Sequence, residues 1–407
     1  MVAKLRSPFP KVPHKQPLRK FSKAEYSNRL KRVKEKMKKE DLDVLLISGN
    51  STFYGCGWAN VRYLTNFTGT LDDVAYVIVP MAGDPALIVS EVHVVADRAY
   101  IISTLDDIRF STPLAYVENI VEVLAENKCT SGKLGIVAPN EYTSIPYNHL
   151  NALMKELPKI TVSDETELLL SIRRIKSEAE IQSIVGASKL CDIAAESLCN
   201  GIRAGMTESD LFAIVEETVV SNGGELPFFS IICSTPTLRP TVYFPHPQAY
   251  GRRLRSGDIV IAEIGPKYAD GYGAQVSVTA ALGKPPNEYY SIFETALESY
   301  ENVTDNLRSG SSLEKLLLVG EAPMKRNRLI RVAPLFHGYG LSLEQPYVGL
   351  SKSWGQRVSK LESNMTGAVE SHPVNRGRIT VRVGSTYLVT SGSPKRLTKF
   401  EPQIFVS

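Results

Sequence analysis

Three of the six histidines stand where they could take part in acid–base chemistry. His246, His337 and His372 each lie beside a proline or glycine, in the second half of the chain and near carboxylates. An imidazole can take up a proton near neutral pH and return it to a leaving group. Glu370 and His372 are two positions apart, so on a strand they share one face. The spacing predicts a pocket in which imidazoles and a carboxylate act together.

Two kinds of element must position these residues. Residues 21–162 alternate helical periods with short apolar runs, among them 43–48, 74–80 and 85–89, and predict an α/β domain. Ser22, followed by Glu25, predicts the start of the first helix, and residues 60–67 are predicted as a further strand. Residues 163–407 open with an amphipathic helical stretch and continue in strand-sized pieces, which predicts an α+β domain. Residues 1–20 form a basic, proline-rich arm.

Composition and charge argue against several classes of protein. A net charge of +4 and 43% hydrophobic residues are typical of a soluble globular protein, and 407 residues favour two domains. No apolar run approaches the roughly 20 residues that span a bilayer, and no signal pattern follows Met1. The five cysteines lack CxxC spacing, which argues against disulfides and thiolate zinc sites. We expect a cytoplasmic protein that binds neither nucleic acid nor membrane.

Several motifs follow one another in a recognisable order. They are residues 256–265 with Tyr272, Gln275 and Thr279; residues 335–341; and residues 365–370 followed by 386–390. Together they resemble the creatinase, aminopeptidase P and prolidase family, as do residues 60–65, 172–181 and 204–211. The resemblance covers almost the whole chain. It implies an α/β N-terminal creatinase-like domain joined to an α+β pita-bread catalytic domain.

The metal-ligand positions of that family are altered in this chain. Family metalloenzymes hold two divalent ions with two Asp, one His and two Glu, whereas the resemblance places Glu263, Gln275, His337, Glu370 and Gly384 at those positions. A glutamine cannot bridge two ions as a carboxylate does, and a glycine offers no ligand. A second histidine, expected soon after the motif around His337, is missing from residues 342–346. We expect no cofactor and at most one weakly held metal ion.

The resemblance is nearest, in the logic of its site, to creatinase, which hydrolyses a guanidino C–N bond without metal. It implies His246 as general acid and base and Glu370 as the anchor for a cationic substrate group, with His337 beside them. Residues expected to line the pocket are Glu263, Gln275 and His372. We therefore predict a metal-independent or single-metal hydrolase of a C–N bond in a small nitrogenous compound.

The N-terminal domain of such proteins contributes pocket residues across a dimer interface. The resemblance implies a homodimer in which Asp73 and Arg62 reach the partner's pocket. In creatinase this region resembles a stretch that grips a substrate carboxylate, whereas residues 71–73 here read Leu-Asp-Asp. The reversed charge predicts a cationic or hydroxylated small molecule rather than creatine.

Three alternative functions stay open. The chain could be a lyase that uses the same pocket, an Xaa-Pro peptidase or dipeptidase with a degenerate metal site, or a non-catalytic binding protein. Structural roles stay open for the individual residues as well. His246 could be a packed loop residue, and Glu370 could pair with Arg378 or Arg382.

Overall fold

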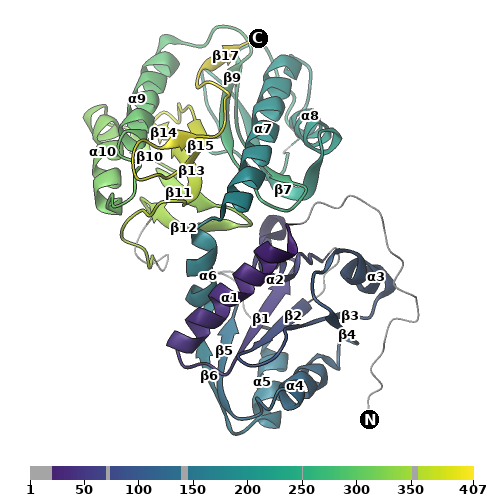
Figure 1. Cartoon of the computed structure of the whole chain (residues 1–407). Coiled ribbons are helices and arrows are strands. Elements are labelled where there is room, and N and C mark those ends of the chain that lie inside the picture. Colours follow the sequence, from purple (N-terminus) through teal and green to yellow (C-terminus); the bar gives the residue numbers. More distant parts are fainter. Residues whose placement is uncertain (1–20, 70–73, 139–144, 250, 351–355) are drawn as a thin grey trace. The chain divides into compact units, whose positions relative to one another are not determined.

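The protein consists of two compact units, which we describe separately (Figure 1). The computed structural model describes residues 21–69, 74–138, 145–249, 251–350 and 356–407. Unit 1 extends to Arg173 and unit 2 runs from Arg174 to Ser407. The predicted order of an α/β domain followed by an α+β domain is confirmed. The arm at residues 1–20 lies outside the described residues.

A six-stranded mixed sheet forms the centre of unit 1, in the order β4-β3-β2-β1-β5-β6. Its strands are β1 (Val44–Asn50), β2 (Val74–Pro80), β3 (Ala86–Ser90), β4 (Asp107–Ser111), β5 (Gly132–Val137) and β6 (Ile160–Asp164). β1 pairs antiparallel with β2 and parallel with β5. The apolar runs predicted at 43–48, 74–80 and 85–89 are therefore strands, and they bury their side chains almost completely.

Helices pack against this sheet and close the core of unit 1. They are α1 (Lys23–Lys39), the 3₁₀ helix η1 (Phe53–Trp58), α2 (Ala59–Thr65), α3 (His93–Ile102), α4 (Tyr116–Glu126), α5 (Tyr147–Glu156) and α6 (Thr166–Arg174). α1 begins as predicted, because the Ser22 hydroxyl accepts a hydrogen bond of 3.2 Å from the backbone N–H of Glu25.

The strand predicted at residues 60–67 is wrong, because most of this segment is helix α2. Val61 and Leu64 are buried one helical turn apart, and Asn66 ends the helix in the left-handed conformation, with φ of 64°. A short run of β-branched and aromatic residues suits a buried strand or a buried helix. The packing around it decides between the two.

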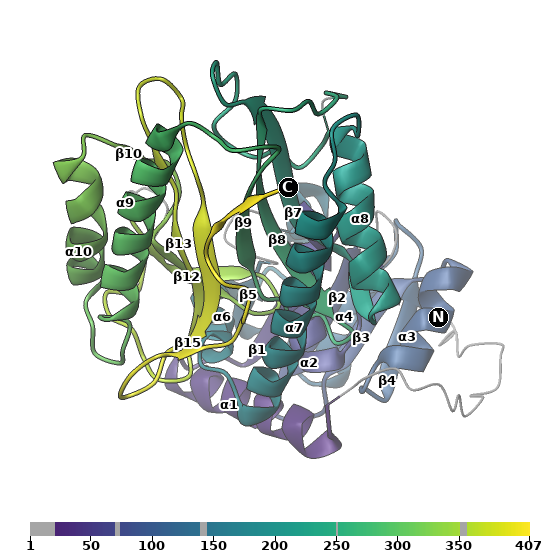
Figure 2. The same cartoon turned by 90° about the horizontal axis from the view of Figure 1, so that it is seen from above.

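Unit 2 has two sheets face to face, each covered by a pair of helices on its outer side (Figure 2). One sheet has the order β17-β9-β8-β7 and the other β12-β11-β13-β15-β16. The first contains β7 (Gly224–Pro236), β8 (Asp258–Tyr268), β9 (Val276–Ala281) and β17 (Ile404–Val406). The second contains β11 (Phe336–Tyr339), β12 (Leu343–Val348), β13 (Thr366–Ser371), β15 (Val383–Leu388) and β16 (Lys395–Arg396), while β10 (Ile330–Arg331) pairs with β14 (Pro373–Val374).

Hydrogen bonds from threonine hydroxyls join the two sheets. Thr386 of β15 accepts from the backbone N–H of Gln275 at 2.7 Å and donates to its carbonyl at 2.9 Å. Thr279 of β9 donates to the carbonyl of Arg382 at 3.0 Å and accepts from its N–H at 2.9 Å. These bonds hold the ends of β9 and β15 in fixed register, which matters because the polar side chains described below lie at this junction.

The helices of unit 2 are α7 (Glu178–Gly201) and α8 (Glu208–Ser221), beside β7–β9, then α9 (Asn287–Thr304), beside β13 and β15, and α10 (Leu313–Arg326), beside α9 and β12. Capping boxes begin α7 at Ser177 and α8 at Thr207. Across the part of the chain that the structure describes, no helix has the length and apolar character needed to cross a membrane. All five cysteines are buried and free.

Candidate functional site

Three ionisable side chains from both sheets of unit 2 meet in its interior. Glu263 lies on β8, His337 on β11 and Glu370 on β13. One ligand atom of each lies within 4.8 Å of those of the other two. All three side chains are buried, the most exposed being His337 at 5%. We call this group the carboxylate cluster.

Arg382 occupies the centre of the carboxylate cluster. Its Nη2 contacts both Glu263 Oε2 and Glu370 Oε2. The side chain is 3% exposed, so the guanidinium is enclosed along with the two carboxylates. The pairing of Glu370 with Arg382, which the sequence left open, is present. The motif comparison had not singled out Arg382 as part of the site.

Several neighbours fix the guanidinium of Arg382. Its Nη1 lies 3.5 Å from Nδ1 of His372, and its carbon lies 5.5 Å from the centroid of the Phe244 ring. The Phe244 ring stacks on His372 at 5.3 Å. His372 Nε2 lies 2.9 Å from the carbonyl oxygen of Tyr243; with the proton on Nε2, His372 donates there and offers Nδ1 to the arginine. The structure therefore places His372 against Arg382.

Burial sets the protonation of the cluster. It raises the pKa of Glu370 to about 8 and lowers the pKa of His337 to about 4, because charged groups lose hydration. Burial also lowers the pKa of Arg382 to about 9, which leaves it charged at neutral pH. The guanidinium of Arg382 then balances the charge of one carboxylate of the cluster.

The two carboxyl oxygens of Glu370 have different contacts. His337 Nδ1 lies 3.2 Å from the carbonyl oxygen of Gly338 and donates to it, so Nε2 is an acceptor. That Nε2 faces Glu370 Oε1 at 3.5 Å. The other oxygen of Glu370, Oε2, accepts from Arg382 and lies 3.5 Å from Nε2 of Gln275. Oε1 is thus the oxygen of Glu370 that lies where it can exchange a proton with His337.

A few buried polar atoms at this site have no hydrogen-bond partner among the described residues. They are Nε of Arg382, Oε1 of Gln275 and Oγ of Ser277. Together they provide a donor, an acceptor and a hydroxyl beside Glu370. An amide or similar group offers the complementary acceptor and donor.

The donor set does not fit two metal ions. A dinuclear centre of the kind that the resemblance implies needs bridging carboxylates, and the residues at two of the five positions are Gln275 and Gly384. Two of the three remaining ligands, Glu263 and Glu370, already share a cation, because Arg382 contacts both carboxylates. A single ion would have to displace the guanidinium.

Besides Gln275 and His372, the predicted site residues His246 and Arg62 are not members of the carboxylate cluster, and Asp73 lies outside the described residues. His246 is half-buried, and its backbone pairs with Ile232 of β7, next to the residue that faces Glu263 on β8. Arg62 lies on α2 of unit 1, and Asp73 falls outside the described residues. The acid–base role of His246 and the contribution of Arg62 and Asp73 to a partner's pocket stay predictions.

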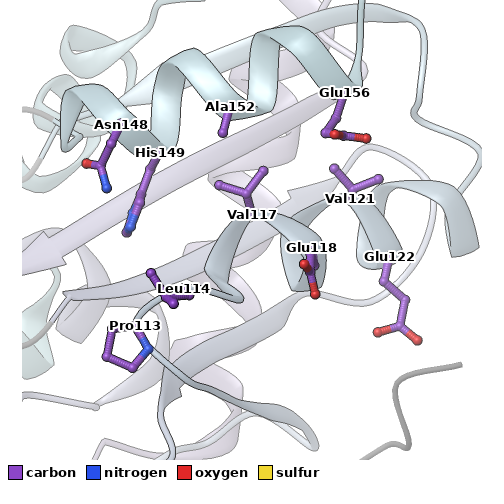
Figure 3. A pocket seen from close by; sticks show the side chains of 10 residues that line it. All are labelled: Pro113, Leu114, Val117, Glu118, Val121, Glu122, Asn148, His149, Ala152 and Glu156. Atoms are coloured by element: carbon purple, nitrogen blue, oxygen red, sulfur yellow. The ribbon is translucent and has the colours of Figure 1, made fainter.

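Unit 1 has a separate hollow of about 470 Å³ between α4 and α5 (Figure 3). Three carboxylates line it, from Glu118, Glu122 and Glu156, together with His149. His149 Nδ1 lies 2.7 Å from the hydroxyl of Tyr76. A hydrogen bond to the core residue Tyr76 gives this histidine a structural role.

Comparisons with known proteins identify both units. Residues 182–391 match the model of metallopeptidase family M24, and residues 29–175 match the creatinase/prolidase N-terminal domain. An Xaa-Pro dipeptidase of Pyrococcus horikoshii is 25% identical over 388 residues, covering 93% of this chain and 99% of that protein.

Solved structures share the fold over most of the chain. A prolidase from Pyrococcus horikoshii has a TM-score of 0.76 at 24% identity, covering 93% of this chain and 99% of that one. An Xaa-Pro dipeptidase from Bacillus anthracis has a TM-score of 0.77 at 20% identity, covering 94% and 100%. The predicted creatinase-like and pita-bread folds are confirmed.

Proposed function

Since the chain belongs to metallopeptidase family M24, we propose that it hydrolyses a C–N bond in a dipeptide-sized substrate, as an Xaa-Pro dipeptidase in which the metal-ligand positions of the family are altered. The name of the Pyrococcus horikoshii relative supports this substrate class. The observation that carries the proposal is the meeting of His337 and Glu370, with an imidazole nitrogen and a carboxyl oxygen 3.5 Å apart, in the pita-bread unit.

The residues of the chain itself can supply acid–base chemistry. Glu370 would donate its proton to the leaving nitrogen, and His337 would accept a proton from the attacking water. Arg382 Nε would donate a hydrogen bond to the carbonyl oxygen of the scissile Xaa-Pro bond, whose nitrogen carries no hydrogen. Segment 241–246 packs on His372 and Arg382 and includes the 40%-exposed Tyr243, so the substrate would enter past it.

A second candidate is the metal-independent hydrolysis of another small nitrogenous compound. Arg382 favours it, because its guanidinium places a positive charge between Glu263 and Glu370 where a peptidase of this family would hold metal. The relatives described above are dipeptidases, so the comparisons favour the Xaa-Pro alternative over the predicted creatinase branch.

Substrate panels test both candidates. The purified protein is incubated with Xaa-Pro dipeptides, with dipeptides lacking proline, and with guanidino and ureido compounds, each in chelator and with added Mn²⁺ or Co²⁺. Chromatography of the released amines identifies the class. We expect cleavage of Xaa-Pro dipeptides, reduced at least about a hundredfold in the E370Q variant, and unchanged in E401Q, which alters an exposed glutamate. Absence of release from every compound would overturn the proposal.

The homodimer stays a prediction that a separate measurement addresses. Sedimentation velocity gives the oligomeric state in solution. If the chain is dimeric and Arg62 serves the partner's site, the R62Q variant has a raised KM with an unchanged sedimentation coefficient.

A further inference from the structure

We propose that the guanidinium of Arg382 is a built-in replacement for the metal ions of the family, and that it closes the carboxylate cluster to divalent cations. One nitrogen atom, Nη2, contacts an oxygen of Glu263 and an oxygen of Glu370. An ion that bridged these carboxylates would need the same position. The proposal concerns the charge balance of the site and is independent of the substrate.

The position of Arg382 follows from the register of the strands. Glu370 on β13 faces Gly384 on β15, and Arg382 precedes Gly384 by two residues. Residues two apart on an extended chain project to the same side, so the arginine extends toward the space that a side chain at 384 would fill. A Cβ at Gly384 would lie 2.5 Å from Ser277 Oγ and 3.2 Å from Glu370 Cβ. Ser277 and Glu370 therefore leave no room for a ligand side chain at position 384. The positive charge comes instead from the arginine two positions earlier.

The arginine is held rigidly. Its backbone N–H and carbonyl both bond to the hydroxyl of Thr279, and its side chain lies against His372 and Phe244. Because Thr279 belongs to the other sheet, the guanidinium is fixed by both halves of unit 2. A cation fixed in this way need not be recruited from solution.

The charges of the cluster agree with a single positive group. The five metal-ligand positions of the family provide two carboxylates here, Glu263 and Glu370, since Gln275 is neutral and Gly384 has no side chain. A divalent ion added beside the guanidinium would give the buried site an excess of positive charge, which is costly at low dielectric. Arg382, Gln275 and Gly384 thus act together to remove the need for metal.

Metal binding tests the proposal directly. The full-length wild-type protein, R382A and R382K are dialysed against chelator, then against Mn²⁺, Co²⁺ or Zn²⁺, and analysed for retained metal and for a change in Tm. We expect wild type and R382K to retain no metal above a chelator-treated blank and to show no metal-dependent Tm shift. R382A should retain one ion, held by Glu263, His337 and Glu370.

Two outcomes would overturn the proposal: wild-type protein that retains one or two ions per chain at this site, or R382A that binds no more metal than wild type. The wild-type measurement remains decisive if R382A does not fold. The E263Q/R382A variant removes a carboxylate together with its cation, so it keeps the charge balance; it should fold and retain no ion. Loss of the proposed hydrolysis would leave these metal measurements unaffected, so the two proposals fail separately.

Discussion

Glu370 and Gly384 face each other across β13 and β15, and only one of them has a side chain. The pair lies where the resemblance places two metal-binding glutamates. Ser277, which pairs with Glu263 on the neighbouring sheet, fills the space beside the glycine. The missing ligand side chain at position 384 and the close packing of Ser277 against Gly384 are therefore linked.

Enlarging Gly384 should destabilise unit 2. In G384A the new Cβ meets Ser277 Oγ at 2.5 Å, which neither the strand pairing nor the packed junction can relieve fully. We expect a loss of about 1–3 kcal/mol in the free energy of unfolding, measured by urea denaturation. The control is S277A/G384A, which removes the hydroxyl in conflict and should recover most of the loss. Ser277 Oγ has no partner among the described residues, so S277A alone should change little. A G384A variant as stable as wild type would contradict this account.

A buried ion pair near the start of unit 2 offers a second test. Lys176 Nζ lies 2.6 Å from Glu344 Oε2, with side chains 1% and 5% exposed. Removing the ammonium takes away a cation that bonds to the buried Glu344 carboxylate, so K176M should lose about 3–5 kcal/mol of stability. The double variant K176M/E344Q removes both charges and should be clearly more stable than K176M, as a double-mutant cycle in urea would show. Equal losses in K176M and the double variant would mean that packing, and not charge, dominates.

The sequence predicted those elements whose local signals agree with their packing. The Ser22 cap of α1 and the apolar runs of β1, β2 and β3 are examples. Helix α2 was missed because its side chains are buried nearly all round, which removes the periodicity that separates helix from strand.

The site was predictable only in part, for a physical reason. Glu263, Gln275, His337 and Glu370 could be located because they stand in motifs. Arg382 could not, since its position depends on the register of β13 with β15 and on the space beside Gly384. Side chains alternate along an extended chain, so residue 382 lies on the same side as residue 384. This places Arg382 near Glu370 only when residue 384 is known to pair with Glu370.

Catalysis should depend on Glu370 and His337 together. H337N removes the acceptor that faces Glu370 Oε1, so turnover of any substrate found should fall about a hundredfold or more. The predicted role of His246 is tested by H246N in the same assay. Loss in H337N with full turnover in H246N would assign the acid–base chemistry to the carboxylate cluster and refute the creatinase-like role of His246. Far-UV circular dichroism and Tm check that both variants fold.

The stability of unit 1 should decrease as the pH is lowered, because of His149. Burial lowers its pKa, despite a bond to the carbonyl of Pro113, so the folded unit binds the proton less readily than the unfolded chain. Its contribution to stability is full above the unfolded pKa of about 6.5 and is lost as pH falls toward the folded value.

The groups that face His149 include Tyr76 and Tyr116. The carboxylates of Glu118, Glu122 and Glu156 line the same hollow.

Hydrogen–deuterium exchange of α5 between pH 5 and pH 8 measures this effect. Wild-type protection should decrease below about pH 6.5, whereas H149N, which cannot be protonated there, should lose less. Y76F removes the hydroxyl that bonds to His149 Nδ1, and it should be about 1–2 kcal/mol less stable at pH 7 while keeping the dependence on pH. Parallel profiles for wild type and H149N would show that other groups control the acid sensitivity of unit 1. A steeper decline in wild type would assign it to the half-buried imidazole of His149, because only this side chain differs between the two proteins.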